Sequence, residues 1–380
     1  MERIPTTPRP GWQQTVAAQG LTFHTTSGGK PYWDESAFYR FTAGEIDVLE
    51  RATYALNEMC LRAAGYVVSE NLWEMFQIPP AFVPWVRASF ERDERTVYGR
   101  FDLAFDGETI KLLEYNADTP TSLLEAAVVQ WHWYRDTAAH KAGADQFNSL
   151  HERLIEAWRA VHADWGDETM YFTSVADAGE DFLTANYLRD TASQAGLTTA
   201  YIAVRDIGYH RARGYTDKQE RPLRHLFKLY PWEWLLREPF GAHLPRPETS
   251  QTRWLEAPWK MLLSNKAILV ILHRLYPDSP FLLRADFAPT GGTWVQKPLL
   301  GREGANTRVV VNGSVLAERG GSYEGASVYQ EYVPLRNFGG GYPVVGSWMV
   351  NGYAAGIGIR EDDSRITGND CRFVPHLFGV

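Results

Sequence analysis

The sequence contains little cysteine, no long apolar run and no excess of basic residues. Its two cysteines, Cys60 and Cys371, are too few for a disulfide framework or a cysteine-based zinc site. No stretch of about 18 apolar residues suggests a membrane span, and the first residues lack the apolar core of a signal peptide. We therefore expect a cytoplasmic protein that has no membrane partner.

The charge balance and the missing motifs exclude further classes of protein. With 46 acidic and 38 basic residues the net charge is -8, which argues against a broad nucleic-acid-binding surface. HExxH, CxxC and GxSxG motifs are absent, and the ten histidines show no metal-ligand spacing. The 380 residues, 44% of them hydrophobic, are enough for a large core in about two or three packed subdomains.

A predicted β-hairpin carries the most informative polar pattern of the chain. Alternating apolar and polar side chains predict strands at 97–105 and 109–116, and Asp106-Gly107 is a typical turn signal. Each strand then presents two polar residues on one of its faces. These residues are Arg100 and Asp102 on the first strand, and Glu114 and Asn116 on the second.

The length of the turn decides whether these two pairs meet, because a shift of one residue moves every side chain to the other face. A two-residue turn at Asp106-Gly107 would separate Asp102 from Glu114. A three-residue turn over 105–107, with Gly107 left-handed, would bring both pairs onto one face, and we predict this turn. The convergent carboxylates, amide and arginine would suit a magnesium ion that carries nucleotide phosphates. The alternative is a solvated hairpin face with an arginine–aspartate ion pair.

The remainder of the chain predicts a mixed α/β fold. Residues 1–40 are aromatic and irregular, and a helix that starts with a capping box follows over 42–64. Alternating helix and strand patterns over 148–204 predict an α/β subdomain with some parallel pairing. The last third is rich in strands, with hairpins that turn at Asn312-Gly313 and Asn351-Gly352.

Two further helix starts lie near polar residues. One helix is predicted from Thr121 or Ser122 to about Ala139, so that its N-terminus lies beside the hairpin. Backbone N–H groups there could bind an anion or a carboxylate, although a helix start that is simply capped is the commoner case. Glu180 and Asp181 open another predicted helix, where acidic pairs usually only complement the helix dipole.

Several cationic side chains lie where a phosphate could bind. Lys266 falls in the first turn of a helix predicted over 264–276, with Ser264 as its cap, and needs an anionic partner there. Lys297 precedes the glycine-rich segment 301–306, which predicts a mobile loop with cationic reach. Arg360 lies on a glycine-rich strand, where the backbone can come close to a ligand.

Taken together, several short motifs resemble those of a known family: YGRFD, LEYNADTPTS, LYPWEW, LSNKA, QKPLLGREGAN, VYQEYVPL and GIGIRE with RFVPH. They are similar to the synthetase domain of glutathionylspermidine synthase, and more closely to stand-alone bacterial relatives that lack the amidase domain. The resemblance extends from about Arg95 to Phe378. It implies an α/β (α+β) protein with an atypical ATP-grasp fold and a pre-ATP-grasp-like α/β subdomain.

The resemblance also implies a division of the chain into four parts. Residues 1–95 would pack on the core as an irregular and helical segment, and residues 96–145 would carry the metal and phosphate hairpin with its following helix. Residues 146–260 would form the α/β substrate subdomain. Residues 261–380 would form the nucleotide-binding and lid part.

The chemistry of the family implies a role for each matching residue. ATP activates a carboxylate as an acyl phosphate and an amine then displaces phosphate, so the site needs magnesium, cations and a lid. The magnesium ligands would be Asp102, Glu114 and Asn116, and the arginines that stabilise the transferred phosphoryl group would be Arg100 and Arg360. ATP would be bound by Lys266, Lys297, Arg302 and Gly304, with adenine at the strand edge of Gln330, Glu331 and Tyr332. Substrate contacts would come from Thr121, Ser122, Glu180 and Asp181.

The expected reaction joins a small-molecule carboxylate, such as a peptide, to an amine, such as a polyamine, with ATP and magnesium as cofactors. Residues 119–122 differ from the substrate loop of the bifunctional enzyme, so glutathione and spermidine are not assumed. The chain begins without the amidase domain, so hydrolysis of the amide product is not expected. Two alternatives stay open: a ligase on the same fold that modifies a protein or an amino acid, and a nucleotide-binding sensor without turnover.

Overall fold

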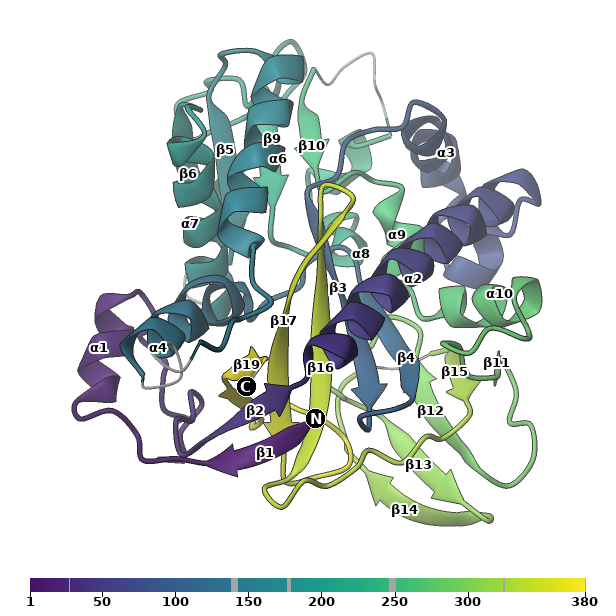
Figure 1. The fold of residues 1–380 in the computed structure, drawn as a ribbon. Coiled ribbons are helices and arrows are strands. Elements are labelled where there is room, and N and C mark those ends of the chain that lie inside the picture. Colours follow the sequence, from purple (N-terminus) through teal and green to yellow (C-terminus); the bar gives the residue numbers. More distant parts are fainter. Residues whose placement is uncertain (27, 138–142, 176–178, 246–250, 324, 380) are drawn as a thin grey trace.

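The centre of the fold is an antiparallel sheet that combines two hairpins from distant parts of the chain (Figure 1). The computed structural model describes residues 1–26, 28–137, 143–175, 179–245, 251–323 and 325–379. In this central sheet the strand order is β18-β17-β16-β3-β4. The strands are β3 (Tyr98–Phe105), β4 (Ile110–Asn116), β16 (Tyr342–Val350), β17 (Tyr353–Asp362) and β18 (Arg372–Val374).

The β3–β4 turn differs from the predicted one. Phe105 pairs with Ile110, so the turn has four residues rather than three. The Asp106 carboxylate accepts hydrogen bonds from the backbone N–H groups of the two residues that close this turn, at 2.9 and 2.7 Å. A β-bulge at Leu113 in β4 then shifts the register, so that Asp102 lies opposite Glu114. The shared face is therefore confirmed, but the turn length that we predicted for it is wrong.

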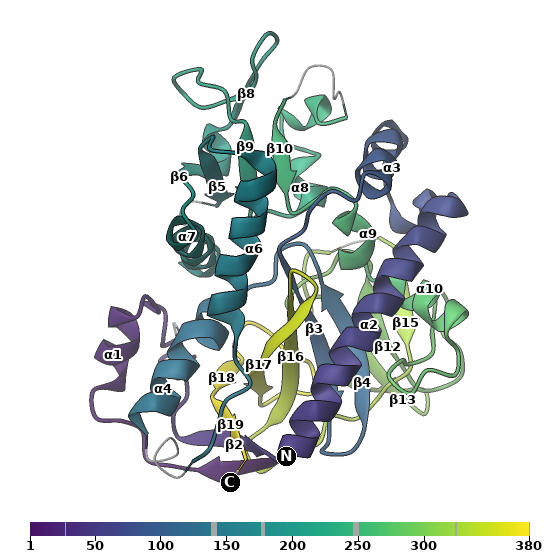
Figure 2. The same cartoon turned by 45° about the horizontal axis from the view of Figure 1, so that its top comes forward.

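Helix α2 (Ala43–Ser69) covers the face of the central sheet that lies opposite to the face of Asp102 and Glu114 (Figure 1 and Figure 2). The predicted capping box is present, because the Thr42 side chain accepts a hydrogen bond from the Glu45 N–H and the Glu45 side chain accepts one from the Thr42 N–H. The helix is longer than the predicted 42–64. Its buried residues pack with odd-numbered residues of β3 such as Phe101, which leaves the even-numbered polar residues on the other face.

A parallel sheet with two helices forms the α/β part of the chain, as the alternating pattern predicts. Its strand order is β10-β9-β5-β6, and Figure 1 shows it at the upper left with α6 and α7 beside it. The strands are β5 (Met170–Ser174), β6 (Thr199–Ala203), β9 (His225–Lys228) and β10 (Arg253–Leu255). The helices are α6 (Leu150–Trp165) and α7 (Gly179–Gln194).

A second antiparallel sheet holds most of the last third, in the order β11-β15-β12-β13-β14. Its strands are β11 (Ala285–Asp286), β12 (Trp294–Pro298), β13 (Arg308–Val311), β14 (Ser314–Glu318) and β15 (Ser327–Gln330). Both predicted Asn-Gly turns are present, because Asn312-Gly313 links β13 to β14 and Asn351-Gly352 links β16 to β17. All four turn residues have positive φ angles, as a primed turn requires.

The helix predicted over 264–276 is present as α10 (Ala267–Leu275), which begins three residues later than predicted and follows the short helix α9 (Lys260–Ser264). Ser264 ends α9, so its predicted role as a cap is wrong. Lys266 is the N-cap residue of α10, and the Asn265 carboxamide oxygen accepts a hydrogen bond from the Ala267 N–H at 2.9 Å. The helix predicted from 121 or 122 begins after Ser122, with a π-helical turn (Glu125–Val129) before α4 (Gln130–Asp136). Its predicted end near Ala139 lies outside the described residues.

The short elements complete the description. They are α3 (Val83–Glu91), α8 (Trp232–Leu235), β7 (Gly208–His210), β8 (Gly214–Thr216) and the 3₁₀ turns Trp73–Phe76, Pro80–Phe82, Val204–Asp206 and Gly241–His243. Among the helices that the structure describes, none has both the length and the apolar character needed to cross a bilayer.

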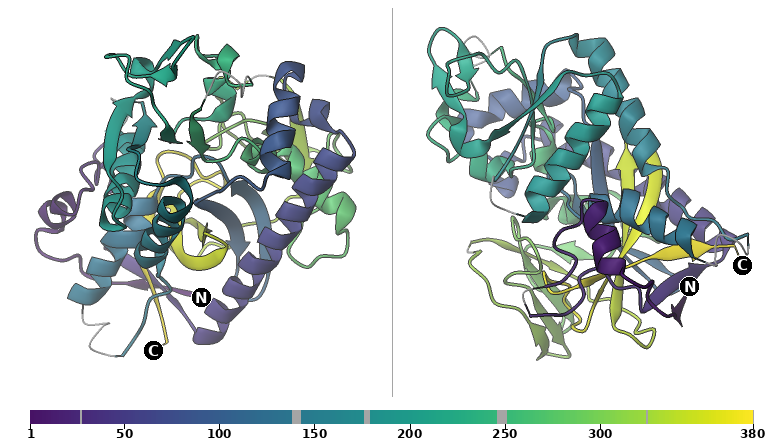
Figure 3. Two further views of the ribbon diagram at one scale, coloured as in Figure 1. Left: turned by 90° about the horizontal axis from the view of Figure 1, so that it is seen from above. Right: turned by 90° about the vertical axis from the view of Figure 1, so that its left-hand side faces the viewer.

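The N-terminal segment is more regular than predicted. It contains β1 (Glu2–Pro5), α1 (Trp12–Ala18) and β2 (Ala37–Phe41), and β2 pairs in parallel with β19 (His376–Phe378) near the other end of the chain. This pairing brings the two termini close together (Figure 1 and Figure 3). The expectation of an irregular segment is wrong because the strands are stabilised by a distant partner, for which the local sequence gives no signal.

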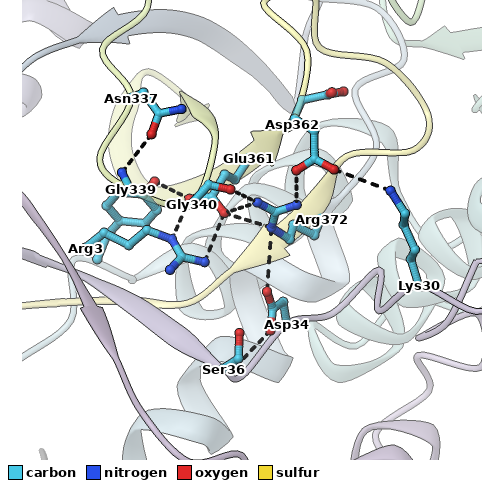
Figure 4. A network of polar contacts seen from close by, with 12 residues as sticks. Arg3, Lys30, Asp34, Ser36, Asn337, Gly339, Gly340, Glu361, Asp362 and Arg372 are labelled. Atoms are coloured by element: carbon cyan, nitrogen blue, oxygen red, sulfur yellow. Dashed lines mark hydrogen bonds and ion pairs between the residues drawn. The ribbon is translucent and has the colours of Figure 1, made fainter.

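A buried carboxylate fixes this segment to the central sheet. Glu361 of β17 accepts hydrogen bonds from Arg3 (Nε–Oε2 2.8 Å), from Arg372 (Nε–Oε1 2.7 Å) and from the Tyr39 hydroxyl. Arg372 also contacts Asp34 at 3.6 Å. Figure 4 shows Arg3 and Arg372 converging on Glu361 from different segments. The Glu361 side chain therefore joins β1 and β2, near the start of the chain, to β17 and β18, near its end. It directly follows Arg360 in β17.

We predict that Glu361→Gln lowers the free energy of unfolding by about 3 kcal/mol, because removing one partner of a buried ion pair leaves the remaining charges uncompensated. This is the lower end of the usual range, since Arg3 and Arg372 keep 13% and 18% exposure. Urea unfolding would measure the change. As a matched control, Glu58→Gln removes an exposed pair with Arg62 and is expected to cost little. Equal effects of both substitutions would contradict the prediction.

Candidate active site

One large cleft brings together every residue that the sequence analysis assigned to a site. Its cavity volume is about 280 Å³, close to the lower end of the roughly 300–1,000 Å³ that is usual for a small-ligand pocket. The assigned residues that line it are Arg100, Asp102, Glu114, Asn116, Thr121, Ser122, Glu180, Asp181, Lys266, Lys297, Arg302, Gly304, Gln330, Glu331, Tyr332 and Arg360.

The Asp102 carboxylate lies between two arginines that come from different strands. Arg100 of β3 donates from Nε to Oδ1 at 2.7 Å, and Arg360 of β17 donates from a terminal nitrogen to Oδ2. Asn116 of β4 also donates to Oδ2, at 3.0 Å. Burial alone would lower the pKa of Arg360, but the Asp102 charge, the other anionic groups nearby and the hydrogen bond to Asp102 together raise it. Both arginines are thus fixed in the cleft as permanent cations.

Gly346 of β16 lies opposite Asp102 of β3 on one side and opposite Gly358 of β17 on the other. A Cβ at Gly346 would lie 2.8 Å from Cδ of Arg100, so the aliphatic part of this arginine occupies the space that a side chain would need. The Arg100 guanidinium lies 5.5 Å from the ring centre of Trp348, the next β16 residue on the same face. The absence of a side chain at Gly346 therefore permits the observed position of Arg100.

Glu114 lies opposite Asp102 and pairs with Lys266, which lies between α9 and α10. Lys266 Nζ is 3.0 Å from Oε2 of Glu114 and donates to the Gly301 carbonyl at 2.6 Å. Burial alone would raise the pKa of Glu114, but the charges of Lys266 and Lys297 hold it well below its usual range. The anionic partner that Lys266 was expected to need is, in this structure, the Glu114 carboxylate.

The β-bulge in β4 supplies one of the hydrogen-bond acceptors of Lys297. Lys297 Nζ donates to the carbonyl of Leu113, the bulged residue, at 2.9 Å and to Oε1 of Gln330 at 2.8 Å. Gln330 in turn donates to the Leu112 carbonyl at 2.9 Å. Burial is the main cause that lowers the pKa of Lys297, to about 8. The end of β15 and the lysine strand β12 are thus both attached to the edge strand of the central sheet.

The chain after Gln330 forms one wall of the cleft. The Glu331 N–H donates to the Arg284 carbonyl at 2.7 Å, and the Tyr332 hydroxyl accepts a hydrogen bond from Arg365 at 3.3 Å. Arg365 belongs to the loop between β17 and β18, which also lines the cleft. The sequence analysis did not identify this loop.

The glycine-rich loop over 301–306 contacts the opposite side of the cleft through Arg302. Its guanidinium donates to Thr119 Oγ1 at 2.7 Å and to Glu233 of α8 at 2.9 Å. Gly304 has φ of 68°, and a Cβ there would lie 2.6 Å from the Thr367 carbonyl. The Nε atoms of Arg302 and Arg360 are buried and have no hydrogen-bond partner among the described residues. Two buried guanidinium N–H donors are thereby left without an acceptor among the described residues.

The end of the cleft near α7 is acidic. Glu180 and Asp181 lie in the first turn of α7, as predicted, and the Ser122 hydroxyl donates to Glu180 at 3.4 Å. Burial, with the charge of Glu180 as the next cause, raises the pKa of Asp181 to about 6. The Thr121 carbonyl accepts a hydrogen bond from Arg100 at 2.5 Å. Tyr32, from the N-terminal segment, also lines this end and was missed because no local pattern marks it.

Asp102, Glu114 and Asn116 supply oxygen atoms of the type that Mg²⁺ prefers, two carboxylates and an amide. They converge from adjacent strands, and Asn116 Nδ2 donates to both carboxylates, at 3.0 and 3.3 Å. Within the described ranges, no group of three or more His, Cys, Asp or Glu side chains is placed to hold a metal ion. These three residues supply donors of the type that suits magnesium, and an ion bound there would take its remaining ligands from phosphates and water.

Comparisons with known proteins agree with the resemblance. The family model described as glutathionylspermidine synthase preATP-grasp matches residues 3–379. A putative acid–amine ligase from Haemophilus influenzae is 40% identical, with 100% of both chains covered. Trypanothione synthetase from Crithidia fasciculata is 31% identical over 84% of this chain, and the bifunctional glutathionylspermidine synthetase/amidase from Escherichia coli is 27% identical over 90%. This chain spans only 53% and 59% of those two longer relatives.

A solved structure shows the same fold. The glutathione synthetase-like effector from Globodera pallida aligns with a TM-score of 0.56 at 10% identity, covering 98% of this chain and 100% of that chain. At this identity the likeness concerns the fold alone. The protein thus has the α/β architecture of the ATP-grasp type that the sequence predicts.

The geometry at Gly346 gives a test of the site. We predict that Gly346→Ala displaces Arg100 from Asp102 and lowers the free energy of unfolding by about 1–3 kcal/mol, as overpacking of a buried position does. A crystal structure of the variant would show the displacement, and urea unfolding would measure the loss. Gly44→Ala is the control, because no atom lies within 4 Å of the added Cβ in α2. An unmoved Arg100 in the Gly346→Ala variant would contradict the prediction.

Proposed function

The chain belongs to the glutathionylspermidine synthase family of ATP-dependent carbon–nitrogen ligases, and from this premise we propose that it is a magnesium-dependent acid–amine ligase that works through an acyl phosphate. Its proposed substrates are a carboxylate, such as a peptide, and an amine, such as a polyamine. The names of the relatives support this choice, since glutathionylspermidine is an amide of a peptide and a polyamine. The acidic end of the cleft, with Glu180 and Asp181, suits a cationic amine.

The observation that carries the proposal is the gathering of five cationic side chains and two carboxylates in the lining of one cleft. A nucleoside triphosphate and an acyl phosphate both carry several negative charges, which such cations neutralise. Two of the guanidinium groups also present a buried Nε without a partner among the described residues. The cations are Arg100, Lys266, Lys297, Arg302 and Arg360, and the carboxylates are Asp102 and Glu114.

In this proposal the chain's own residues bind and orient the reactants. Arg100 and Arg360 stabilise the charge that develops as the phosphoryl group moves to the carboxylate. Lys266 and Lys297 bind the phosphates of ATP, and the strand end at Gln330 and its two following residues holds adenine. Asp102, Glu114 and Asn116 would hold magnesium, which neutralises phosphate charge when it is bound.

The glycine-rich loop serves as a lid in this proposal. Arg302 connects it to Thr119 and to Glu233 of α8, so the loop reaches across the cleft between the nucleotide and substrate sides. A covered cleft keeps water away from the acyl phosphate, which would otherwise hydrolyse. Residues 146–260 would then contribute the substrate side, and residues 261–380 the nucleotide side.

The proposed reaction predicts that ADP release requires magnesium-ATP, an acid and an amine together. We would cross glutathione and other small peptides with spermidine, putrescine and related amines, and identify the product by mass spectrometry. Release that needs one acid and one amine supports the ligase. If the protein binds ATP but releases no ADP with any pair of acid and amine, the result would contradict the ligase. A protein adduct would indicate protein ligation instead.

The metal assignment predicts that Asp102→Asn or Glu114→Gln lowers turnover by at least about 10²–10³-fold, because each removes charge that positions the phosphates. Asp106→Asn is the matched control. It lies in the β3–β4 turn and its amide oxygen can still accept the turn hydrogen bonds. Turnover of the Asp102 or Glu114 variants that equals the control would contradict the assignment.

The proposed phosphate role of Lys297 predicts a pH dependence. Since burial lowers the pKa of Lys297 to about 8, its charge is complete below that value and is lost as the pH rises through it. ATP affinity, measured by calorimetry without divalent cations, should fall about tenfold by one pH unit above the pKa. Lys297→Arg should keep its affinity over the same range, because a guanidinium stays charged. Equal profiles of the two proteins would contradict the role.

A further inference from the structure

A chain of hydroxyl and carboxyl groups leads out of the acidic end of the cleft into the protein. The Ser122 hydroxyl donates to Oε1 of Glu180 at 3.4 Å and lies 3.3 Å from the Tyr32 hydroxyl. The Tyr32 hydroxyl donates to Oε1 of Glu125 at 2.7 Å. We call these four residues, Glu180, Ser122, Tyr32 and Glu125, the relay. Three of them line the cleft, and Glu125 lies behind Tyr32 with 1% exposure.

The buried carboxyl group at the end of the relay has a neutral hydrogen-bond partner. Asp118, Glu256 and Glu361 each pair with a lysine or arginine, whereas Glu125 accepts its hydrogen bond from a neutral phenol. Burial raises the pKa of Glu125 to about 7, with the Glu180 charge as the next cause, while Arg100 opposes the shift. Glu125 is therefore a carboxyl group that can change protonation near neutral pH.

The backbone around the relay is irregular, as it often is at functional sites. Ser122 has φ of 63°, a left-handed conformation that is uncommon for serine and directs its hydroxyl between Tyr32 and Glu180. Glu125 opens the π-helical turn that follows. Ser122 also directly follows Thr121, whose carbonyl is held by Arg100. Ser122 of the relay is thus the neighbour of a residue that Arg100, an arginine of the proposed phosphoryl-transfer site, contacts.

We propose that Glu125 is the final acceptor of the proton that the attacking amine loses, and that Glu180, Ser122 and Tyr32 conduct this proton to it. The inference rests on the proposed ligase function. Glu125 acts through the other three residues, so it is a positioning and proton-accepting residue that does not itself touch the substrate.

An ammonium N–H bond breaks and its proton binds the Glu180 carboxylate, which leaves a neutral amine with a free electron pair. Glu180 then gives this proton to the Ser122 hydroxyl, which gives its own to Tyr32, and Tyr32 gives its own to Glu125. The amine forms the C–N bond at the acyl carbon while the C–O bond to phosphate breaks, and phosphate leaves with that electron pair. The second proton lost by the nitrogen passes to the emptied Glu180 carboxylate and from there to water.

The reaction needs such an acceptor because alkylamines are protonated at neutral pH. With a pKa near that of lysine, only about one molecule in 10³ is neutral at pH 7. A carboxylate whose pKa lies near the working pH is well suited to accept the proton. The groups that face Glu125 are Tyr32 from the N-terminal segment, Glu180 from α7 and Arg100 from β3, and Cys371 faces Tyr32 from the β17–β18 loop.

The experiment compares two nucleophiles in the Glu125→Gln variant. An alkylamine must lose a proton before it attacks, whereas hydroxylamine is largely unprotonated at neutral pH. We expect the rate with the alkylamine, relative to the rate with hydroxylamine, to fall about 10²-fold, the usual size of general-base effects. In the wild type, kcat/KM for the alkylamine should rise with pH through about 7, as the Glu125 carboxylate becomes ionised. The rate should level off above this pH, whereas in Glu125→Gln it should keep rising with pH, in proportion to the fraction of neutral amine.

Two further variants separate proton transfer from a structural effect. Tyr32→Phe leaves Glu125 in place but interrupts the relay, so it should lower the same ratio, whereas Glu125→Asp should restore part of it. Equal losses with both nucleophiles, or an unchanged pH profile in Glu125→Gln, would overturn the inference while the ligase function stands. If the wild type used neither nucleophile with any acid tested, the ligase function itself would be overturned, and the relay with it.

Discussion

The position of the Asp102 carboxylate between Arg100 and Arg360 is the interaction on which the cleft depends. It requires β3, β16 and β17 to lie in one sheet and Gly346, between them, to leave space for the Arg100 side chain. Like charges of two arginines can only be held so close when a carboxylate neutralises them. The central sheet, assembled from both halves of the chain, supplies this arrangement, and α2 supports it from the other face.

One extra residue in β4 converts this sheet into a site. Without the bulge at Leu113, the four-residue turn would direct Glu114 to the face that α2 covers, where a carboxylate would be buried in apolar surroundings. The bulge also leaves the Leu113 carbonyl available to Lys297, which attaches the second antiparallel sheet to the central one. The bulge at Leu113 therefore determines both the register of β4 and its attachment to the second antiparallel sheet.

Much of the fold could be predicted from local signals. The capping box at Thr42, the Asn-Gly turns and the paired polar residues of the hairpin all lie where the sequence placed them, because each depends on neighbouring residues. The turn length was wrong because a bulge leaves no mark in an alternating pattern. Tyr32 and the Glu361 network were missed because their partners lie in distant segments. The roles of the cleft residues came from the resemblance, since charge patterns alone also fit a solvated surface.

The pairing of β2 with β19 has a consequence for the synthesis of the protein. β2 pairs with β1 and β3 pairs with β4, but the partners on their other sides, β19 and β16, belong to the last strands of the chain. A nascent chain on the ribosome therefore carries one unpaired edge on each of β2 and β3 until translation has nearly finished. The parallel α/β sheet, whose strands lie within one continuous segment, can form earlier. Folding of the cleft is therefore a late event, completed only when the last strands emerge.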